Sequence, residues 1–374
     1  MTTSALRVLV MPDKFKGTLT SAQAARAIVR GLKRAWPHAH FTTQALADGG
    51  EGFARALLSA TGGAWRRART TDAAGRACVA GWGLLGDGAT AVLDLAAASG
   101  LAQLPPALRD ASRTSTFGSG VLIRRALAAG AKRIVVGLGG SATNEGGVGL
   151  ASALGWKFLD RHGEAIDSNG AGLLQLQRIV APKPRPRVRI LAACDVDNPL
   201  FGRRGAAFQF APQKGADAPT VRTLDRALRR LARIVERDLG VDLARIPGAG
   251  AAGGCGFGLM AFCGARLDSG FDILRHEIGL DALVRAHDLV VTGEGAFDAT
   301  SLDGKAPYRL AQLARVHRVP AWGLFGRIDV ATAKLPFERA AALVAGDAAL
   351  PASIDAAEHA RRLEAAACDL AARA

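Results

Sequence analysis

Apolar and polar residues follow one another, near the start of the chain, in the order expected of strands and helices. A short apolar run over 6–10 predicts a strand, and residues 21–36 carry apolar side chains at helical spacing. A second apolar run over 41–45 predicts another strand. We expect the helix to begin at Ser21 as its N-cap. The residues expected on its buried face are Ala25, Ile28, Val29 and Leu32. A strand, a helix and a strand at this spacing are typical of a parallel α/β sheet.

The last third of the chain has the same pattern. The expected elements are strands over 288–292, 321–325 and 341–344 and helices over 307–317 and 355–372. The middle of the chain is richer in glycine and carries several Gly-rich loops. We therefore predict an α/β protein of two domains. A doubly wound parallel sheet would be built from both chain ends, 1–62 and 286–374, and a second α/β domain, 63–285, would be inserted between them.

Composition narrows the class of protein. The chain has 374 residues, of which 49% are hydrophobic and 22% charged, and these values are typical of a globular protein. No apolar run approaches the roughly 20 residues of a membrane span, and the N-terminal segment lacks the pattern of an export signal. The five cysteines are scattered and never spaced as CxxC. A reducing cytoplasm is therefore the expected location, with no membrane partner.

The formal net charge of +15 raises the possibility of a nucleic-acid partner. The densest basic stretch, 222–237, alternates with apolar residues at helical spacing, so we interpret it as the solvated face of an amphipathic helix. Aromatic residues are only 5% of the chain, whereas nucleic-acid modules usually interleave them with basic residues. A non-catalytic nucleic-acid-binding protein remains an alternative that rests on charge alone.

Much of the glycine lies in a few segments that also hold polar residues. The chain has 45 glycines, and the segments are 12–17, 48–52, 137–149, 195–215, 248–258 and 293–305. Lys14, Lys16, Lys214 and Lys305 lie in these loops or beside their glycines. Glycine allows the close backbone approach that phosphate-binding loops need, and lysine is a compact point charge for phosphates. Several such loops together indicate an anion or nucleotide site.

Residues 137–142 match the G-x-G-x-x-A fingerprint of dinucleotide-binding folds. The segment follows a predicted strand over 133–136, but the residues after it are glycines and polar groups where the crossover helix should be apolar. A second match over 248–253 follows Pro247 rather than a strand. Gly304 and Lys305 are followed by alanine, so no Walker A motif is present. An NAD(P)-dependent oxidoreductase is the main alternative function, although it explains one loop only.

Carboxylates follow the strand predicted over 188–192. Asp195 and Asp197 would lie at its carboxyl end, where open α/β sheets carry their active sites. Their spacing suits a Mg²⁺ ion or a base beside a metal, and an Asx-turn that caps Pro199 is the equally weighted alternative. No histidine lies in a Gly-rich segment, and no G-x-S-x-G elbow occurs. Positioned lysines, a metal-binding carboxylate and a carboxylate base fit phosphoryl transfer.

Together these segments resemble the bacterial glycerate kinases of type 1. The matching segments, in family order, are PDKFKGTL (12–19), ADGGEG (47–52), GLGGSATNEGG (137–147), CDVDNPL (194–200), PQKGA (212–216), PGAGAAGG (247–254), TGEG (292–295) and GKAP (304–307). The resemblance implies a flavodoxin-like domain with an inserted α/β domain and an active site in the cleft between them. It also implies phosphorylation of D-glycerate by ATP with Mg²⁺, most often to 2-phosphoglycerate, with 3-phosphoglycerate the other possible product.

The resemblance suggests roles for individual residues. As ATP-binding residues we expect Gly139, Gly140, Gly253, Gly254, Glu294 and Lys305. As substrate-binding residues we expect Lys14, Asp48, Ser141 and Asn144. As catalytic residues we expect Asp195, Asp197, Lys16 and Lys214, with Asp195 and Asp197 also as the metal ligands. The chain departs from the common pattern at Glu145, Ala211, Ala296 and Thr300. A monomer and a homodimer are both compatible with the sequence, and no nucleic-acid partner is expected.

Overall fold

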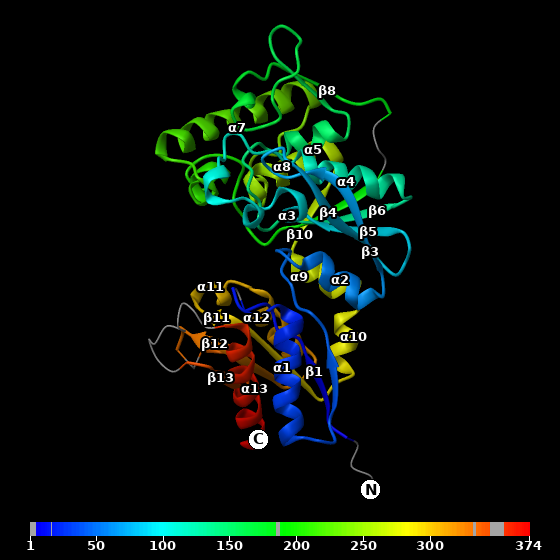
Figure 1. Ribbon diagram of the computed structural model, residues 1–374, viewed down its shortest axis with the longest axis vertical. Helices are drawn as coiled ribbons and strands as arrows, with labels where there is room; N and C mark the ends of the chain where they lie inside the picture. The colour runs from blue at the N-terminus through cyan, green and yellow to red at the C-terminus, as the bar shows by residue number, and fades with distance from the viewer. Residues whose placement is uncertain (1–4, 16, 185–187, 332–333, 345–354) are drawn as a thin grey trace. The chain divides into compact units, whose positions relative to one another are not determined.

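The first strand pairs with strands from opposite ends of the chain. Figure 1 shows the computed structural model, which describes residues 5–15, 17–184, 188–331, 334–344 and 355–374. In it, β1 (Arg7–Val10) runs parallel to β2 (His40–Thr43) on one side and to β11 (Leu289–Phe297) on the other. Val8 thereby lies opposite both Phe41 and Leu289. The predicted sheet of strands from both chain ends is confirmed.

The chain divides into two units, residues 1–48 with 274–374 (unit 1) and residues 49–273 (unit 2). These boundaries differ from those expected at 62/63 and 285/286. They place α2 (Phe53–Thr61) in unit 2 and α10 (Leu280–Arg285) in unit 1. α9 (Gly270–Glu277) crosses the second boundary.

The sheet of unit 1 has the strand order β2-β1-β11-β12-β13, with β12 at Ala321–Ile328 and β13 at Arg339–Ala342. Every neighbouring pair is parallel. Numbered along the chain within this unit, the order is 2-1-3-4-5, which is that of flavodoxin-like folds. The order reverses between β1 and β11. Ligands of such folds bind outside the carboxyl ends of the strands at this reversal.

Helices α1 (Ser21–Ala35) and α13 (Ala356–Ala372) pack against each other and share one apolar core with the sheet. Ala25, Ile28 and Leu32 are buried there as predicted, and Val29 is partly buried. The predicted N-cap is wrong by one residue. Thr20 caps α1 by accepting the N–H of Gln23, whose side chain accepts the N–H of Thr20 in return. This reciprocal capping box satisfies two backbone donors.

Two further helices of unit 1 follow β11, and the second of them lies within one residue of the helix predicted over 307–317. They are α11 (Ala299–Leu302) and α12 (Ala306–Val316), and α12 packs against β11 and β12. One expectation was wrong: the strand predicted over 288–292 does not end before the Gly-Glu-Gly segment. β11 continues to Phe297, because Glu294 pairs with Phe325 and Ala296 with Arg327 on β12. Glu294 is therefore fixed on a strand in the middle of the sheet.

Unit 2 holds a six-stranded sheet in the order β10-β9-β6-β5-β4-β3. Its strands are β3 (Ala64–Thr71), β4 (Ala77–Leu84), β5 (Thr90–Asp94), β6 (Arg133–Gly137), β9 (Arg189–Ala193) and β10 (Arg266–Asp268). β5, β6, β9 and β10 are parallel, whereas β3 and β4 pair antiparallel. A separate antiparallel pair comprises β7 (Lys157–Leu159) and β8 (Arg178–Val180).

The helices of unit 2 are α3 (Ala96–Ser99), α4 (Phe117–Ala128), α5 (Val148–Ala153), α6 (Ala206–Phe210), α7 (Ala218–Leu239) and α8 (Ala251–Cys263), besides α2 and the start of α9. α7 contains the basic stretch 222–237 and buries Leu224, Leu228 and Leu231. Its arginines therefore occupy the outer face of an amphipathic helix, as predicted. Across the residues that the structure describes, no helix is long and apolar enough to cross a membrane.

Candidate active site

Asp13 lies immediately beyond the carboxyl end of β1, at the reversal of strand order in unit 1. Its backbone N–H donates to the carbonyl oxygen of Gly293 on β11 at 2.8 Å, and its Oδ1 accepts the N–H of Lys14 at 2.7 Å. The residue is buried. Burial and the charges of Asp48 and Glu294 raise the pKa of Asp13 to about 7, although Lys14 opposes the shift. A carboxylate held in this way can exchange a proton near neutral pH.

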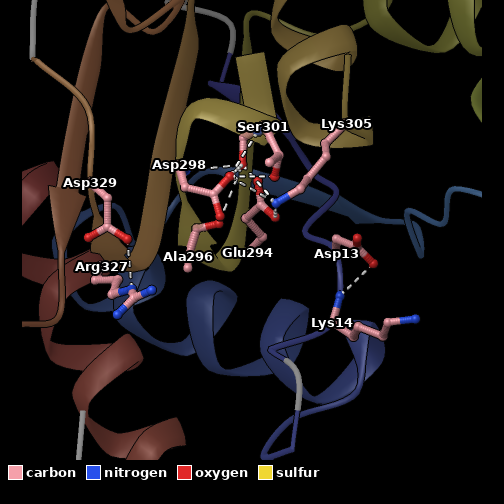
Figure 2. A network of polar contacts seen from close by, with 10 residues as sticks. Asp13, Lys14, Glu294, Ala296, Asp298, Ser301, Lys305, Arg327 and Asp329 are labelled. Carbon is pink, nitrogen blue, oxygen red and sulfur yellow. Dashed lines mark hydrogen bonds and ion pairs between the residues drawn. The ribbon is translucent and has the colours of Figure 1, made fainter. Parts of the chain in front are cut away.

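A network on β11 and α11 lies beside Asp13 (Figure 2). The Nζ of Lys305 donates to Ser301 Oγ at 3.0 Å and to Asp298 Oδ1 at 3.4 Å, and it lies 3.6 Å from Glu294 Oε2. Glu294 is only 7% exposed, and burial raises its pKa. Its Oε1 has no hydrogen-bond partner among the described residues. We refer to Asp13, Lys14, Asp48, Glu294, Asp298, Ser301 and Lys305 as the Asp13 cluster.

The hydroxyl of Ser21 joins the two loops that carry Asp13 and Asp48. Its Oγ donates to the carbonyl oxygen of Pro12 and accepts the N–H of Leu46 at 3.2 Å. The same N–H also lies 3.3 Å from the Pro12 carbonyl. Because Pro12 precedes Asp13 and Leu46 is two residues before Asp48, this contact fixes the loops after β1 and β2 against each other.

Lys214 is the centre of a second cluster, in unit 2. Its Nζ donates to Ser141 Oγ at 2.9 Å and to the carbonyl oxygen of Thr143 at 2.7 Å. The side chain is 2% exposed, and burial lowers its pKa to about 7, although Glu145 opposes the shift. The amine holds the loop after β6 in place. A bound anion would restore its charge, because an anion stabilises the protonated form.

Buried polar groups surround this amine. Glu145 accepts from Thr116 Oγ1 at 2.6 Å and from the N–H of Gly149 at 2.8 Å, and its burial raises its pKa. Asn144 is 1% exposed, and neither of its side-chain polar atoms has a partner within the described parts of the chain. Buried polar groups are usually satisfied, so these atoms point to a missing polar ligand or water. Lys214, Ser141, Thr143, Asn144 and Glu145 form the Lys214 cluster.

The glycines at the start of α8 pack on this cluster. Gly253 and Gly254 have φ of 67° and 87°, inside a helix whose first turn is not helical. A Cβ on Gly253 would lie 1.9 Å from the carbonyl oxygen of Thr143, and the carbonyl of Gly253 accepts the N–H of Gly146 at 3.0 Å. No side chain fits at this approach, so the Gly-rich sequence is explained by loop packing.

The loop at 49–52 lies over the carboxyl end of the sheet of unit 2. Gly139 donates its N–H to the carbonyl oxygen of Gly49 at 3.1 Å, and Gly140 accepts the N–H of Leu101 at 2.9 Å. Asp94, at the end of β5, accepts the N–H groups of Gly52 and Ala54 at the start of α2. The segment 138–147 contains no helix, and α5 begins only at Val148. The dinucleotide fingerprint needs a helix directly after the strand, so the oxidoreductase alternative loses its structural support.

Asp195 and Asp197 follow β9, as predicted, and both are exposed. Asp195 accepts the N–H of Gly270, at the start of α9, at 3.2 Å and 3.3 Å from its two oxygens. Asp197 forms an ion pair of 2.7 Å with Arg204. Within the described residues, no group of three or more His, Cys, Asp or Glu side chains is arranged to hold a metal ion.

Comparison with known proteins decides the family. A model of the glycerate kinase family matches residues 8–374. The chain belongs to the glycerate kinase family. The glycerate kinase of Halalkalibacterium halodurans is 42% identical over 324 residues, which cover 86% of this chain and 85% of the relative. The glycerate 2-kinase of Escherichia coli is 41% identical over 326 residues, 86% of each chain. Within the family, a crystal structure described as "putative glycerate kinase 2" from Salmonella typhimurium LT2 matches with a TM-score of 0.88 and 38% identity, covering 99% of this chain and 98% of that one.

Half of the site residues expected from the resemblance fall into the two clusters. Lys14, Asp48, Glu294 and Lys305 belong to the Asp13 cluster. Ser141, Asn144 and Lys214 belong to the Lys214 cluster, and Gly253 and Gly254 pack on it. Gly139 and Gly140 lie in the loop after β6, and Asp195 and Asp197 follow the end of β9. Lys16 lies outside the described residues. The assigned roles stay predictions.

Five residues of these clusters were not predicted as site residues: Asp13, Thr143, Glu145, Asp298 and Ser301. Asp13 had a detectable signal, since it is the first carboxylate after the first strand of a doubly wound sheet. Of the positions where the chain departs from the common family pattern, Thr300 donates its hydroxyl to Asp298 at 2.5 Å, and Ala296 accepts from Ser301 Oγ at 3.4 Å through its carbonyl. The Thr300 side chain therefore contacts a carboxylate that neighbours Lys305, whereas the contact of Ala296 is made by its backbone.

Proposed function

We propose that the protein transfers the γ-phosphoryl group of ATP to D-glycerate, giving 2-phosphoglycerate and ADP. The observation that carries the proposal is the presence of lysines among hydroxyl- and glycine-rich loops in a chain of this family. Lys14 and Lys305 are the cations of the Asp13 cluster, and Lys214 is the cation of the Lys214 cluster. Phosphoryl transfer depends mainly on such positioned cations, because negative charge spreads over the transferred group. The name of the Escherichia coli relative supports the 2-phosphate as product.

The two clusters suit different parts of the reactants. Lys214, Ser141 and Asn144 present amine, hydroxyl and amide groups, which can bind the carboxylate and hydroxyls of glycerate or a phosphate. Lys305 lies between two carboxylates and a hydroxyl, so its charge is fixed in position before a phosphate arrives. We assign Lys305 and Glu294 to ATP and Lys14 to the substrate or the transferring group.

Mg²⁺ is part of the proposal as the companion of the ATP phosphates. Asp195 and Asp197 offer exposed carboxylate oxygens, and Mg²⁺ commonly takes one or two carboxylates together with phosphate oxygens and water. The donor chemistry of this pair fits the ion, provided that Arg204 releases Asp197. When bound, the ion would offset phosphate charge. Protein residues alone do not surround a metal site in the part of the chain that the structure describes.

The test is a coupled assay with D-glycerate, ATP, Mg²⁺ and enolase, run with and without phosphoglycerate mutase. We expect phosphoenolpyruvate with enolase alone, because enolase uses the 2-phosphate directly. Signal only in the presence of mutase would show a 3-kinase and overturn the proposed product. Silence in both assays, with folded protein and working coupling enzymes, would overturn the substrate assignment.

A further inference from the structure

We propose that Asp13 is the catalytic base that accepts the proton of the attacking glycerate hydroxyl. The inference rests on the proposed function and assigns its proton-transfer step to one residue. The sequence predicted this role for Asp195 or Asp197 and none for Asp13. The contacts of the described residues favour Asp13 for three reasons, which concern its placement, its charged neighbours and its shielding from water.

The first reason is placement. Asp13 follows β1 and is joined by its N–H to Gly293 on β11, so it lies where the strand order of unit 1 reverses. Ligands of flavodoxin-like folds bind at this point, outside the carboxyl ends of the strands. The N–H of Lys14 fixes Oδ1, and the contact between Ser21 and Pro12 fixes the preceding residue. A base held by the backbone on both sides needs little reorganisation to meet a hydroxyl.

The second reason is the set of charges facing Asp13. From β11 it faces Glu294, from the loop after β2 it faces Asp48, and on its own loop Lys14 is the neighbouring cation. Two carboxylates favour a proton on Asp13, and its pKa of about 7 matches the range in which a general base works best. The buried Oε1 of Glu294 has no partner among the described residues, an independent sign that a polar ligand belongs at this cluster.

The third reason is shielding from water. Asp13 is 9% exposed, whereas the side chain of Asp197 is 71% exposed and ion-paired with Arg204. Asp195 is also exposed and accepts a helix N–H. Shielding from water raises the proton affinity of a carboxylate, which is the property that a base needs. The exposed oxygens of Asp195 and Asp197 are instead accessible to a cation.

The glycerate hydroxyl oxygen forms a bond to the γ-phosphorus of ATP while its proton passes to the Asp13 carboxylate. The bond from the γ-phosphorus to the bridging oxygen breaks, and ADP leaves with that electron pair. Asp13 then releases the proton to solvent. Nothing is oxidised or reduced, and ATP is the only co-reactant.

The experiment compares Asp13→Asn with the wild type and with Asp329→Asn. Asp329 is an aspartate of the same unit that pairs with Arg327, outside the Asp13 cluster (Figure 2). We expect Asp13→Asn to lower kcat by about 10²-fold or more, with KM for ATP within about threefold of wild type. The acid limb of the kcat/KM profile near pH 7 is expected to disappear. Asp329→Asn is expected to keep both kcat and the limb.

Folding is checked in the same samples. Asparagine has the shape of aspartate and removes the repulsion from Asp48 and Glu294, so the Tm of Asp13→Asn at pH 8 is expected to be no lower than that of wild type. Asp195→Asn and Asp197→Asn are two further variants, and both are expected to keep the acid limb of the kcat/KM profile. A lower Tm together with a normal pH limb in Asp13→Asn would show a structural role and overturn the inference.

The remaining outcomes separate the inference from the proposed function. An active wild type with an equally active Asp13→Asn overturns the inference alone. If Asp195→Asn or Asp197→Asn loses the acid limb while Asp13→Asn retains it, the base is one of the two aspartates after β9. This result also overturns the inference. A folded wild type that phosphorylates no glycerate overturns the proposed function, and with it the assignment of Asp13.

Discussion

The Nζ of Lys214 donates to the carbonyl oxygen of Thr143 at 2.7 Å, although the lysine side chain is almost completely buried. The contact joins the turn before α7 to the loop after β6, across 71 residues of sequence. Because burial lowers the pKa of this amine to about 7, it is largely neutral above that pH and still has two N–H groups for its two acceptors.

The depressed pKa of Lys214 predicts a pH-dependent stability. In the unfolded chain the amine stays protonated up to about pH 10.4, so unfolding above pH 7 takes up a proton. The free energy of unfolding should therefore rise with pH from about 7 and level off above about 10. Between pH 7.5 and 9 the depressed pKa of Lys214 should raise the free energy of unfolding by about 2 kcal/mol. Urea titrations at both pH values should show this rise in the free energy of unfolding for the wild type but not for Lys214→Met. Lys132→Met, at an exposed lysine, should follow the wild type. The same change of unfolding free energy with pH in the wild type and both variants would mean that Lys214 is charged in the folded protein.

Gly253 and Gly264 form a matched pair at the two ends of α8. Their φ values, 67° and 63°, are nearly equal, but only Gly253 faces a backbone atom at 1.9 Å from an added Cβ, and Gly264 faces open space. Gly264→Ala should cost about 1–2 kcal/mol, the strain of a left-handed alanine. Gly253→Ala should cost more, because the Thr143 carbonyl must also move, and it should lower kcat/KM. Denaturant unfolding and steady-state kinetics of both variants test this. Equal losses of stability would show that the close approach costs nothing.

Adjacent hydroxyls at the start of α1 have separable roles. Thr20 caps the helix, so Thr20→Ala should lower the free energy of unfolding by about 1 kcal/mol and leave kcat within about twofold. Ser21 joins the loops before Asp13 and Asp48, so Ser21→Ala should lower kcat by about tenfold through misplacement of these loops. The free energy of unfolding and kcat, measured for each variant, test the two roles. A kcat for Ser21→Ala equal to that of Thr20→Ala would remove the positioning role.

Lys305 should matter for the nucleotide. Its Nζ lies near Glu294 and Asp298, so Lys305→Met removes a cation and leaves two carboxylates facing the phosphates. We expect KM for ATP to rise by about tenfold, in line with the loss of one charge-assisted hydrogen bond, with a smaller change in KM for glycerate. Lys334→Met, at an exposed lysine of the same unit, is the control. An unchanged KM for ATP would place the nucleotide elsewhere.

The sequence predicted the fold well because its signals are local. The apolar runs at 6–10 and 321–325 and the amphipathic pattern at 21–36 depend on near neighbours, and the corresponding elements formed within a few residues. The extent of β11 was missed, because Gly-Glu-Gly resembles a turn, whereas pairing of Glu294 and Ala296 with β12 keeps it extended. Tertiary pairing overrode local preference there.

The candidate site was predicted only in part. Lys214 and Lys305 were identified from their glycine-rich surroundings, but nothing local shows that one is buried and the other half-exposed. Asp13 was missed because its special environment comes from Glu294, far away in sequence, and from Asp48 on the next loop. Shifted proton affinities of this kind arise from long-range packing, and residue order alone does not reveal them.

The split of unit 1 across both ends of the chain has a consequence for biosynthesis. The ribosome releases β1, α1 and β2 first, but β1 pairs with β11, and Arg30 on α1 forms an ion pair with Glu364 on α13. Unit 2, in contrast, consists of the continuous segment 49–273. Because domains generally fold as their residues emerge, unit 2 is expected to fold while the chain is still growing. The N-terminal strand must wait, with one edge unpaired and exposed to aggregation, until nearly the whole protein has been made.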